Sequence, residues 1–158
     1  MTQLSLFAEL EPPAVCEVND RPWLTSPLTS ADYDPGHPWY YLHGGAPLEP
    51  DAIEPAKCDG MESKLPKNPA KAREELERRL AEATGSLADA IARYQDIRAR
   101  GAEALSHYDR TISSGGRDDM AVATALSLTA SHVSWFKGRI LDLQSLIAGS
   151  TNPTRSNE

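Results

Sequence analysis

The fold is decided by residues 69–112, which read PAKAREELERRLAEATGSLADAIARYQDIRARGAEALSHYDRTI. Asn68 just before this stretch is a good N-cap, and Pro69 is a good first helical residue. Apolar or small side chains then recur in steps that are mostly three and four residues, the pattern of an amphipathic helix or coiled coil. The positions are Leu76, Leu80, Ala83, Leu87, Ile91, Tyr94, Ile97, Gly101, Leu105, Tyr108 and Ile112.

This pattern predicts a helix over residues 70–113. Gly85 and Gly101 each weaken that helix by roughly 1 kcal/mol relative to alanine, so a bend is expected at one of them.

A second helix follows a glycine turn. Residues 113–116, Ser-Ser-Gly-Gly, end the first helix, and Asp118 and Asp119 suit the positive end of the next. Its apolar stripe repeats in alternating steps of four and three up to Gly149. The stripe is Val122, Leu126, Thr129, Val133, Phe136, Ile140, Leu143 and Ile147. The expected fold is therefore mainly α: a long, coiled-coil-like antiparallel helical hairpin over residues 67–149, with a disordered tail at 150–158.

The hairpin is preceded by a proline-rich segment, residues 13–66. Residues 8–66 hold 10 of the 12 prolines, a density that prevents a long helix. The segment is nevertheless rich in aromatic residues, which disordered chains usually lack. We expect largely irregular chain that packs on the helices. Residues 39–42, Trp-Tyr-Tyr-Leu, are expected to form a short strand closed by a turn at residues 43–45.

Leu128, Trp135 and Leu146 form a second apolar stripe, outside the main stripe of the later helix. Two helices alone would leave these side chains in water, so they are candidates for a second interface. The sequence leaves two possibilities for what packs on these side chains. One is the N-terminal segment, through Trp23 and Trp39, and the other is a second copy of the protein, which would make a homodimer.

Near the start of the chain, Gln3, Leu4, Ser5, Leu6 and Phe7 place three large apolar side chains in five residues, and no periodic pattern continues them. This pentapeptide resembles the bacterial sliding-clamp-binding motif, Gln-Leu-(Ser or Asp)-Leu-Phe, and matches it at all five positions. The resemblance implies that residues 3–7, within a flexible tail over residues 1–12, bind the replicative DNA sliding clamp. It covers these five residues alone, and the alternative is that they pack on the protein's own helices.

Charge and composition restrict the partners. The net charge is −7, and residues 1–66 hold 11 acidic residues against three basic ones. This imbalance argues against direct nucleic-acid binding by that half. The sequence contains neither a secretory signal pattern nor an apolar run long enough to span a membrane, so a cytoplasmic protein with reduced thiols and without membrane association is expected.

Metal binding and catalysis are not predicted. Cys16, His37, His43 and Cys58 are separated by 20, 5 and 14 residues and lack the close cysteine pair of compact zinc sites. No phosphate loop or dinucleotide fingerprint is present. We therefore expect a protein that is not an enzyme and has no cofactor.

The functional expectation is an adaptor or regulator of replication that binds the sliding clamp. Its small size and the lack of a familiar domain suggest a phage or plasmid origin. The alternative is a helical scaffold or inhibitor, unrelated to replication, that binds another protein through the acidic N-terminal half or the hairpin.

Overall fold

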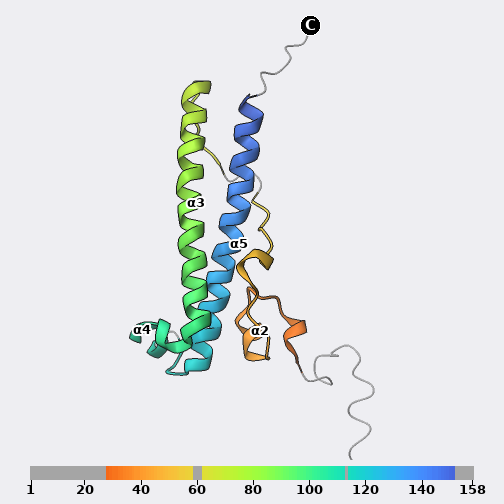
Figure 1. The fold of residues 1–158 in the computed structure, drawn as a ribbon, viewed down its shortest axis with the longest axis vertical. Coiled ribbons are helices and arrows are strands. Elements are labelled where there is room, and N and C mark those ends of the chain that lie inside the picture. Colours follow the sequence, from red (N-terminus) through yellow and green to blue (C-terminus); the bar gives the residue numbers. More distant parts are fainter. Residues whose placement is uncertain (1–27, 59–61, 113, 152–158) are drawn as a thin grey trace, which may run out of the picture.

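The structure is a computed structural model and describes residues 28–58, 62–112 and 114–151. Over these residues the fold is mainly helical, as the sequence predicts, and contains no strand. Two long helices dominate, α3 (Pro69–Arg100) and α5 (Asp118–Thr151) (Figure 1). The shorter elements are η2 (Ser30–Asp32), α2 (Pro38–Leu42), η3 (Pro50–Ala52), η4 (Gly101–Ala104) and α4 (His107–Thr111).

Helix α3 begins where the sequence predicts and ends earlier. The Asn68 side chain accepts hydrogen bonds from the backbone N–H groups of Ala70 and Lys71. The expected helix over 70–113 is wrong at its end, because α3 stops at Arg100. Gly101 follows with φ +59° and ψ −131°, a conformation available to glycine that takes the chain out of the helix.

Because α3 ends at Arg100, two residues of the predicted apolar stripe are exposed instead of buried. Tyr108 lies in α4 and Ile112 follows it, and they are 64% and 66% exposed instead of buried. Leu105, just before α4, is buried in the core. The break at Gly101 therefore turns the last two stripe positions away from α5.

Helix α5 begins after Gly115 and Gly116, both with positive φ, which turn the chain as the sequence predicts. It runs to Thr151, so the predicted end at Gly149 is two residues too early. Residues 152–158, which contain most of the expected disordered tail, lie outside the described residues.

Helices α3 and α5 lie side by side and run in opposite directions (Figure 1). Between them lie two hydrophobic clusters that use the predicted stripes. The larger is centred on Tyr94, Ile97 and Val133, which are at most 1% exposed. The smaller contains Leu76, Ala83 and Leu143. The shared cores hold the two helices together.

Residues 39–42 belong to a helix, so the predicted strand is wrong. Pro38 is the first residue of α2, and the His37 ring accepts a hydrogen bond from the Trp39 N–H as the N-cap. This start resembles that of α3, where a capping residue also precedes proline. The local start signal decides the structure here, in spite of the strand preference of aromatic residues.

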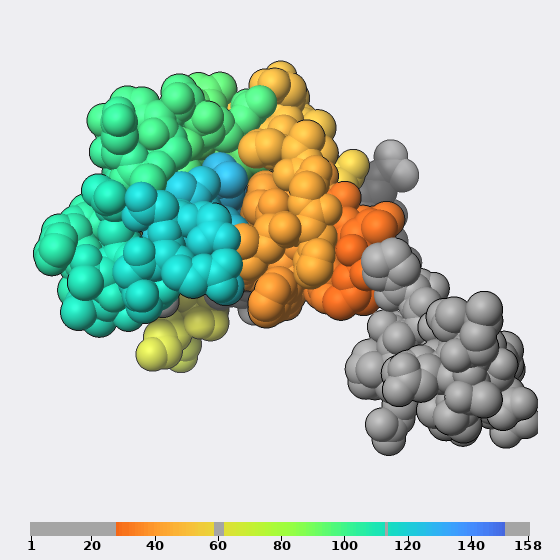
Figure 2. All heavy atoms as spheres, turned by 90° about the horizontal axis from the view of Figure 1, so that it is seen from below, coloured from red at the N-terminus to blue at the C-terminus, as the bar shows by residue number. Residues whose placement is uncertain are grey.

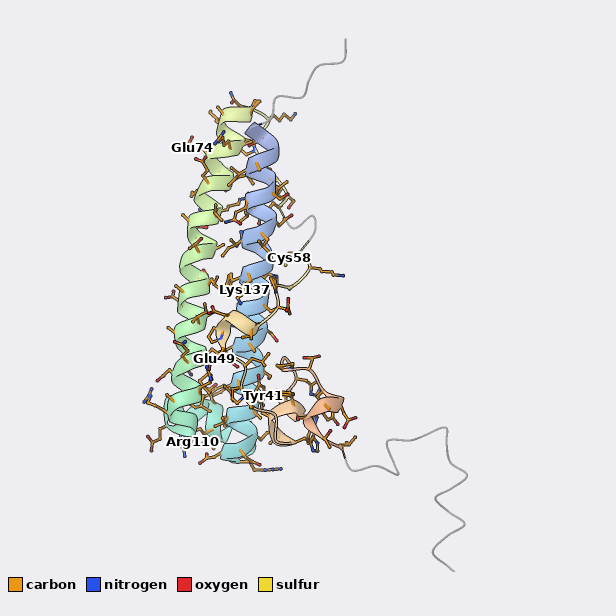
Figure 3. The ribbon with its side chains drawn as sticks, turned by 45° about the vertical axis from the view of Figure 1, so that its right-hand side comes forward. Tyr41, Glu49, Cys58, Glu74, Arg110 and Lys137 are labelled. Carbon is orange, nitrogen blue, oxygen red and sulfur yellow. The ribbon has the colours of Figure 1, made fainter. Side chains whose placement is uncertain are left out.

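The segment before α3 packs along the helix pair. Seen from below, residues 28–56 lie beside α5 and reach α3 (Figure 2). Tyr94 of α3 donates a hydrogen bond to the Leu48 carbonyl at 2.9 Å, and Arg98 pairs with Glu49 at 2.8 Å. From α5, Lys137 donates to the Pro50 carbonyl (Figure 3). Consecutive residues are thus tied to both helices.

Candidate interaction surface

The residues predicted to bind partners lie in different places. Residues 3–7 lie outside the described residues. Leu128, Trp135 and Leu146 all lie on α5 with exposed side chains, but the structure does not bring them into one site. Leu128 lines a small hollow near α4, whereas Trp135 lines a larger groove beside residues 34–56.

This larger groove, which we call the α5 groove, has a volume of about 560 Å³. That volume lies within the usual range for ligand pockets. Its lining is mostly apolar, and the polar residues in it are Asp34, Glu54, Ser131 and Ser134. The lining residues are Asp34, Pro35, Gly36, Leu48, Ala52, Ile53, Glu54, Ala56, Ala130, Ser131, Ser134 and Trp135.

One wall of the α5 groove is fixed to α5 by close backbone contacts. The Ala56 N–H donates to the Ser134 carbonyl at 2.9 Å, and the Ser134 hydroxyl donates to the Glu54 carbonyl at 2.6 Å. Gly138 makes this approach feasible, because a Cβ placed there would lie 2.1 Å from the Ala56 carbonyl oxygen. The Cys58 thiol lies buried beside it and donates to the Trp135 carbonyl at 3.7 Å.

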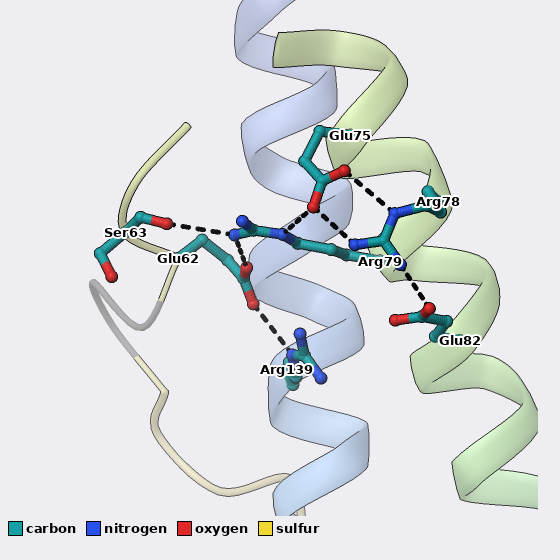
Figure 4. A network of polar contacts seen from close by, with 7 residues as sticks. All are labelled: Glu62, Ser63, Glu75, Arg78, Arg79, Glu82 and Arg139. Carbon is teal, nitrogen blue, oxygen red and sulfur yellow. Dashed lines mark hydrogen bonds and ion pairs between the residues drawn. The ribbon is translucent and has the colours of Figure 1, made fainter. Parts of the chain in front are cut away.

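A buried ion-pair network fixes the chain just beyond this wall. Glu62, whose side chain is 3% exposed, accepts hydrogen bonds from Arg79 of α3 at 2.6 Å and from Arg139 of α5 at 2.9 Å (Figure 4). Burial raises the pKa of Glu62, but the hydrogen bonds from Arg139 and Arg79 outweigh it and hold the pKa below its ordinary value. Glu62 is therefore a charged bridge between the two helices.

The network continues along α3 at the surface. Arg79 also bonds Glu75 at 2.9 Å, and Arg78 bonds Glu75 at 2.6 Å and pairs with Glu82. Hydrogen bonds from Arg78 and Arg79 lower the pKa of Glu75 to about 2. This carboxylate remains charged at any physiological pH, and it helps to orient Arg79 toward Glu62.

Trp135 joins the groove to the network. Trp135 lines the α5 groove, and the Arg139 guanidinium lies over its ring, 5.6 Å from the ring centre. Because Glu62 holds Arg139, the orientation of the indole is tied to the bridge between the helices. Trp135 is 37% exposed, so a bound partner would find a large apolar side chain already fixed in position.

The residues considered for metal binding do not gather into a site in the described part of the chain. His37 and His43 both stack on the Tyr33 ring, at centroid distances of 5.3 and 5.4 Å. Cys58 lies against α5, and Cys16 lies outside the described residues. Within residues 28–58, 62–112 and 114–151, no group of three or more His, Cys, Asp or Glu side chains is placed to hold a metal ion.

Sequence reasoning missed the α5 groove and the Glu62 bridge. Glu62 is separated by 17 residues from Arg79 and by 77 from Arg139, so no local pattern connects them. Gly138, a lone glycine in the middle of a helix, was the one available signal, because such a glycine often marks a close backbone approach.

Comparisons with models of protein families, with curated proteins and with solved structures gave no match to this chain. None of the described helices has the length and apolar character needed to cross a membrane.

Proposed function

We propose that this protein is a non-enzymatic adaptor or regulator that binds the bacterial replicative DNA sliding clamp through residues 3–7. The observation that carries the proposal is the agreement of Gln3-Leu4-Ser5-Leu6-Phe7 with the clamp-binding consensus at all five positions. At ordinary residue frequencies, a chain of this length matches by chance in only about one protein in several thousand.

The residue types suit an extended peptide in an apolar pocket. Leu6 and Phe7 are the anchors, and burying both contributes roughly 3–6 kcal/mol before the cost of ordering the peptide. The Gln3 amide can donate and accept hydrogen bonds at the pocket edge and so fix the register. Leu4 adds an apolar contact, and Ser5 faces the other way. The expected affinity of the motif alone is micromolar, about −8 kcal/mol at most.

In this proposal, residues 28–151 are the body that the pentapeptide delivers to the clamp. We take α3 and α5 as a coiled-coil-like antiparallel hairpin, which the shared hydrophobic clusters support. The hairpin would either recruit a second protein or occupy the clamp so that a polymerase is excluded. The cellular setting of this proposal is the bacterial cytoplasm, where the clamp works.

A second candidate function is a helical scaffold or inhibitor whose target is unrelated to replication. The exposed apolar side chains of α5 support it, because Leu128 is 55% and Leu146 is 38% exposed. A second copy of the chain that covered these side chains would make a dimer. For a clamp-binding protein, a dimer would also present two pentapeptides to a ring with repeated sites and raise avidity.

The test is calorimetric titration of a purified bacterial sliding clamp with the full chain and with the double variant Leu6→Ala, Phe7→Ala. The double variant is expected to bind roughly 100-fold more weakly, because both anchors are lost. Leu10→Ala, which removes a leucine outside the motif, is the matched control and is expected to bind like the unchanged chain. Equal binding by the double variant, or no binding by any of the three, would reject the proposal.

A further inference from the structure

The lining of the α5 groove suits an occupant that is apolar and carries no negative charge. Helix α5 contributes Ala130, Ser131, Ser134 and Trp135 to its lining, and the acidic residues Asp34 and Glu54 are among the other lining residues. An acidic peptide would be repelled by the negative charges of Asp34 and Glu54, whereas an uncharged apolar peptide would bury its side chains against the apolar lining.

The chain itself carries such a peptide at a suitable distance. Residues 3–7 contain no charged side chain and three large apolar ones. Residues 8–27 join them to Leu28, and the groove lining begins six residues after Leu28, at Asp34. Six residues span at most about 20 Å and twenty residues up to about 70 Å, so the pentapeptide can reach every part of the groove.

We propose that residues 3–7 dock in the α5 groove of their own chain when the clamp is absent, so that groove and clamp compete for the same pentapeptide. The competition with the clamp rests on the proposed function, whereas the docking of residues 3–7 in the groove does not. The tether sets an effective concentration on the order of 1 mM, so a groove contact too weak to form between separate molecules is populated within one chain.

Competition gives the groove a regulatory effect. A clamp can bind only those chains whose pentapeptide is undocked, so the apparent affinity is the intrinsic affinity multiplied by the undocked fraction. A partner that fills the groove, or a change that opens the wall at residues 54–58, would release the pentapeptide. Clamp binding would then be controlled from the helical body.

The first test needs no clamp. Amide NMR signals of Gly36, Ala56 and Ser131 are compared between the full chain and its Leu6→Ala, Phe7→Ala variant. Docking predicts that these signals shift in the variant, that Leu10→Ala leaves them unchanged, and that the shifts are the same in dilute and concentrated samples. Unchanged groove signals would overturn the proposal.

Other occupants give different results in the same experiment. The groove signals could instead respond to the double variant Trp23→Ala, Leu24→Ala and not to the pentapeptide variant. That result would assign the groove to residues nearer Leu28 and overturn the proposal. Signals that depend on protein concentration, with a dimer mass in sedimentation, would assign it to a second copy and also overturn it.

The second test measures the competition. Ser131 is exposed on α5 within the groove lining, so Ser131→Trp fills the groove without entering the core. This variant is expected to bind the clamp about 3- to 10-fold more tightly than the unchanged chain. Ser145→Trp adds the same side chain at an exposed position outside the groove lining and is expected to have no effect. Equal clamp affinities for both would overturn the competition, whereas absence of clamp binding by every variant would reject the proposed function and leave the NMR result standing.

Discussion

Gly85 and Gly138 lie inside the two long helices and are expected to respond in opposite ways to substitution by alanine. A Cβ at Gly85 meets nothing within 4 Å, whereas a Cβ at Gly138 would lie 2.1 Å from the Ala56 carbonyl oxygen and 2.8 Å from the Cys58 sulfur. Alanine is favoured over glycine in a helix by about 1 kcal/mol at both positions. The difference in the free energy of unfolding between the two variants therefore reports on the close approach of residues 56–58 to α5.

The magnitude follows from the contacts. Gly85→Ala is expected to raise the free energy of unfolding by about 0.5–1 kcal/mol. Gly138→Ala gains the same amount but introduces overpacking against backbone, which typically costs about 1–3 kcal/mol. Moving the wall away also loses the hydrogen bond from the Ala56 N–H to Ser134, worth about 0.5–1.5 kcal/mol. The net expectation for Gly138→Ala is a loss of about 1–3 kcal/mol.

Two measurements check this expectation. Urea unfolding followed by circular dichroism gives the free energies, with the slope m compared between variants to detect a change in compactness. Thiol labelling in a Cys16→Ser background reports on Cys58, which is 6% exposed. Gly138→Ala is expected to label faster than the background chain, and Gly85→Ala to label at the same rate. Equal stabilisation by both variants, with Cys58 still protected in each, would refute the close contact.

Three further substitutions test the fixed points of the helix pair. Glu62→Gln is expected to lower the free energy of unfolding at pH 7 by about 1–3 kcal/mol, because Arg79 and Arg139 lose a buried charged partner. Since the pKa of Glu62 is held below its ordinary 4.5, this contribution is present above pH 4.5 and disappears as the pH falls through the lowered pKa. Urea unfolding across pH 3–7 should therefore show that the Glu62→Gln variant loses less stability on acidification than the unchanged chain. Parallel pH profiles of the two proteins would contradict this expectation. Gly101→Ala places a side chain at φ +59° and is expected to destabilise the protein by about 1 kcal/mol or more. Thermal unfolding measures this, and an unchanged midpoint temperature would contradict a turn that requires glycine. Tyr94→Phe removes the hydrogen bond to the segment before α3 and is expected to cost about 0.5–1.5 kcal/mol with the same fold by circular dichroism, whereas no loss would show that this contact adds nothing.

The helices could be predicted because their signals are local. The Asn68-Pro69 start, the stripe through Tyr94 and Ile97 and the Gly115-Gly116 turn each depend on neighbouring residues. The same kind of signal is present at His37-Pro38, but the strand prediction rests on the aromatic residues that follow and does not use it, and the chain forms α2 there.

The groove and its supports could not be predicted, because they depend on contacts between distant segments. Proline-rich chain has no periodicity to show which side chains face α5. Gly101 could either bend the helix or end it. The outcome depends on whether packing Tyr108 and Ile112 contributes more free energy than the turn at Gly101, and the spacing of apolar residues does not decide this. The candidate site therefore emerges from tertiary packing, whereas the clamp hypothesis depends on a linear motif.

The most direct measurement of the central claim is a competition titration. The full chain is titrated into a purified bacterial sliding clamp, alone and after saturation of the clamp with the free consensus peptide Gln-Leu-Asp-Leu-Phe. If residues 3–7 are the clamp-binding element, micromolar binding is seen without the peptide and is lost or greatly weakened with it. Binding of equal strength in both titrations, or no binding in either, would contradict the account.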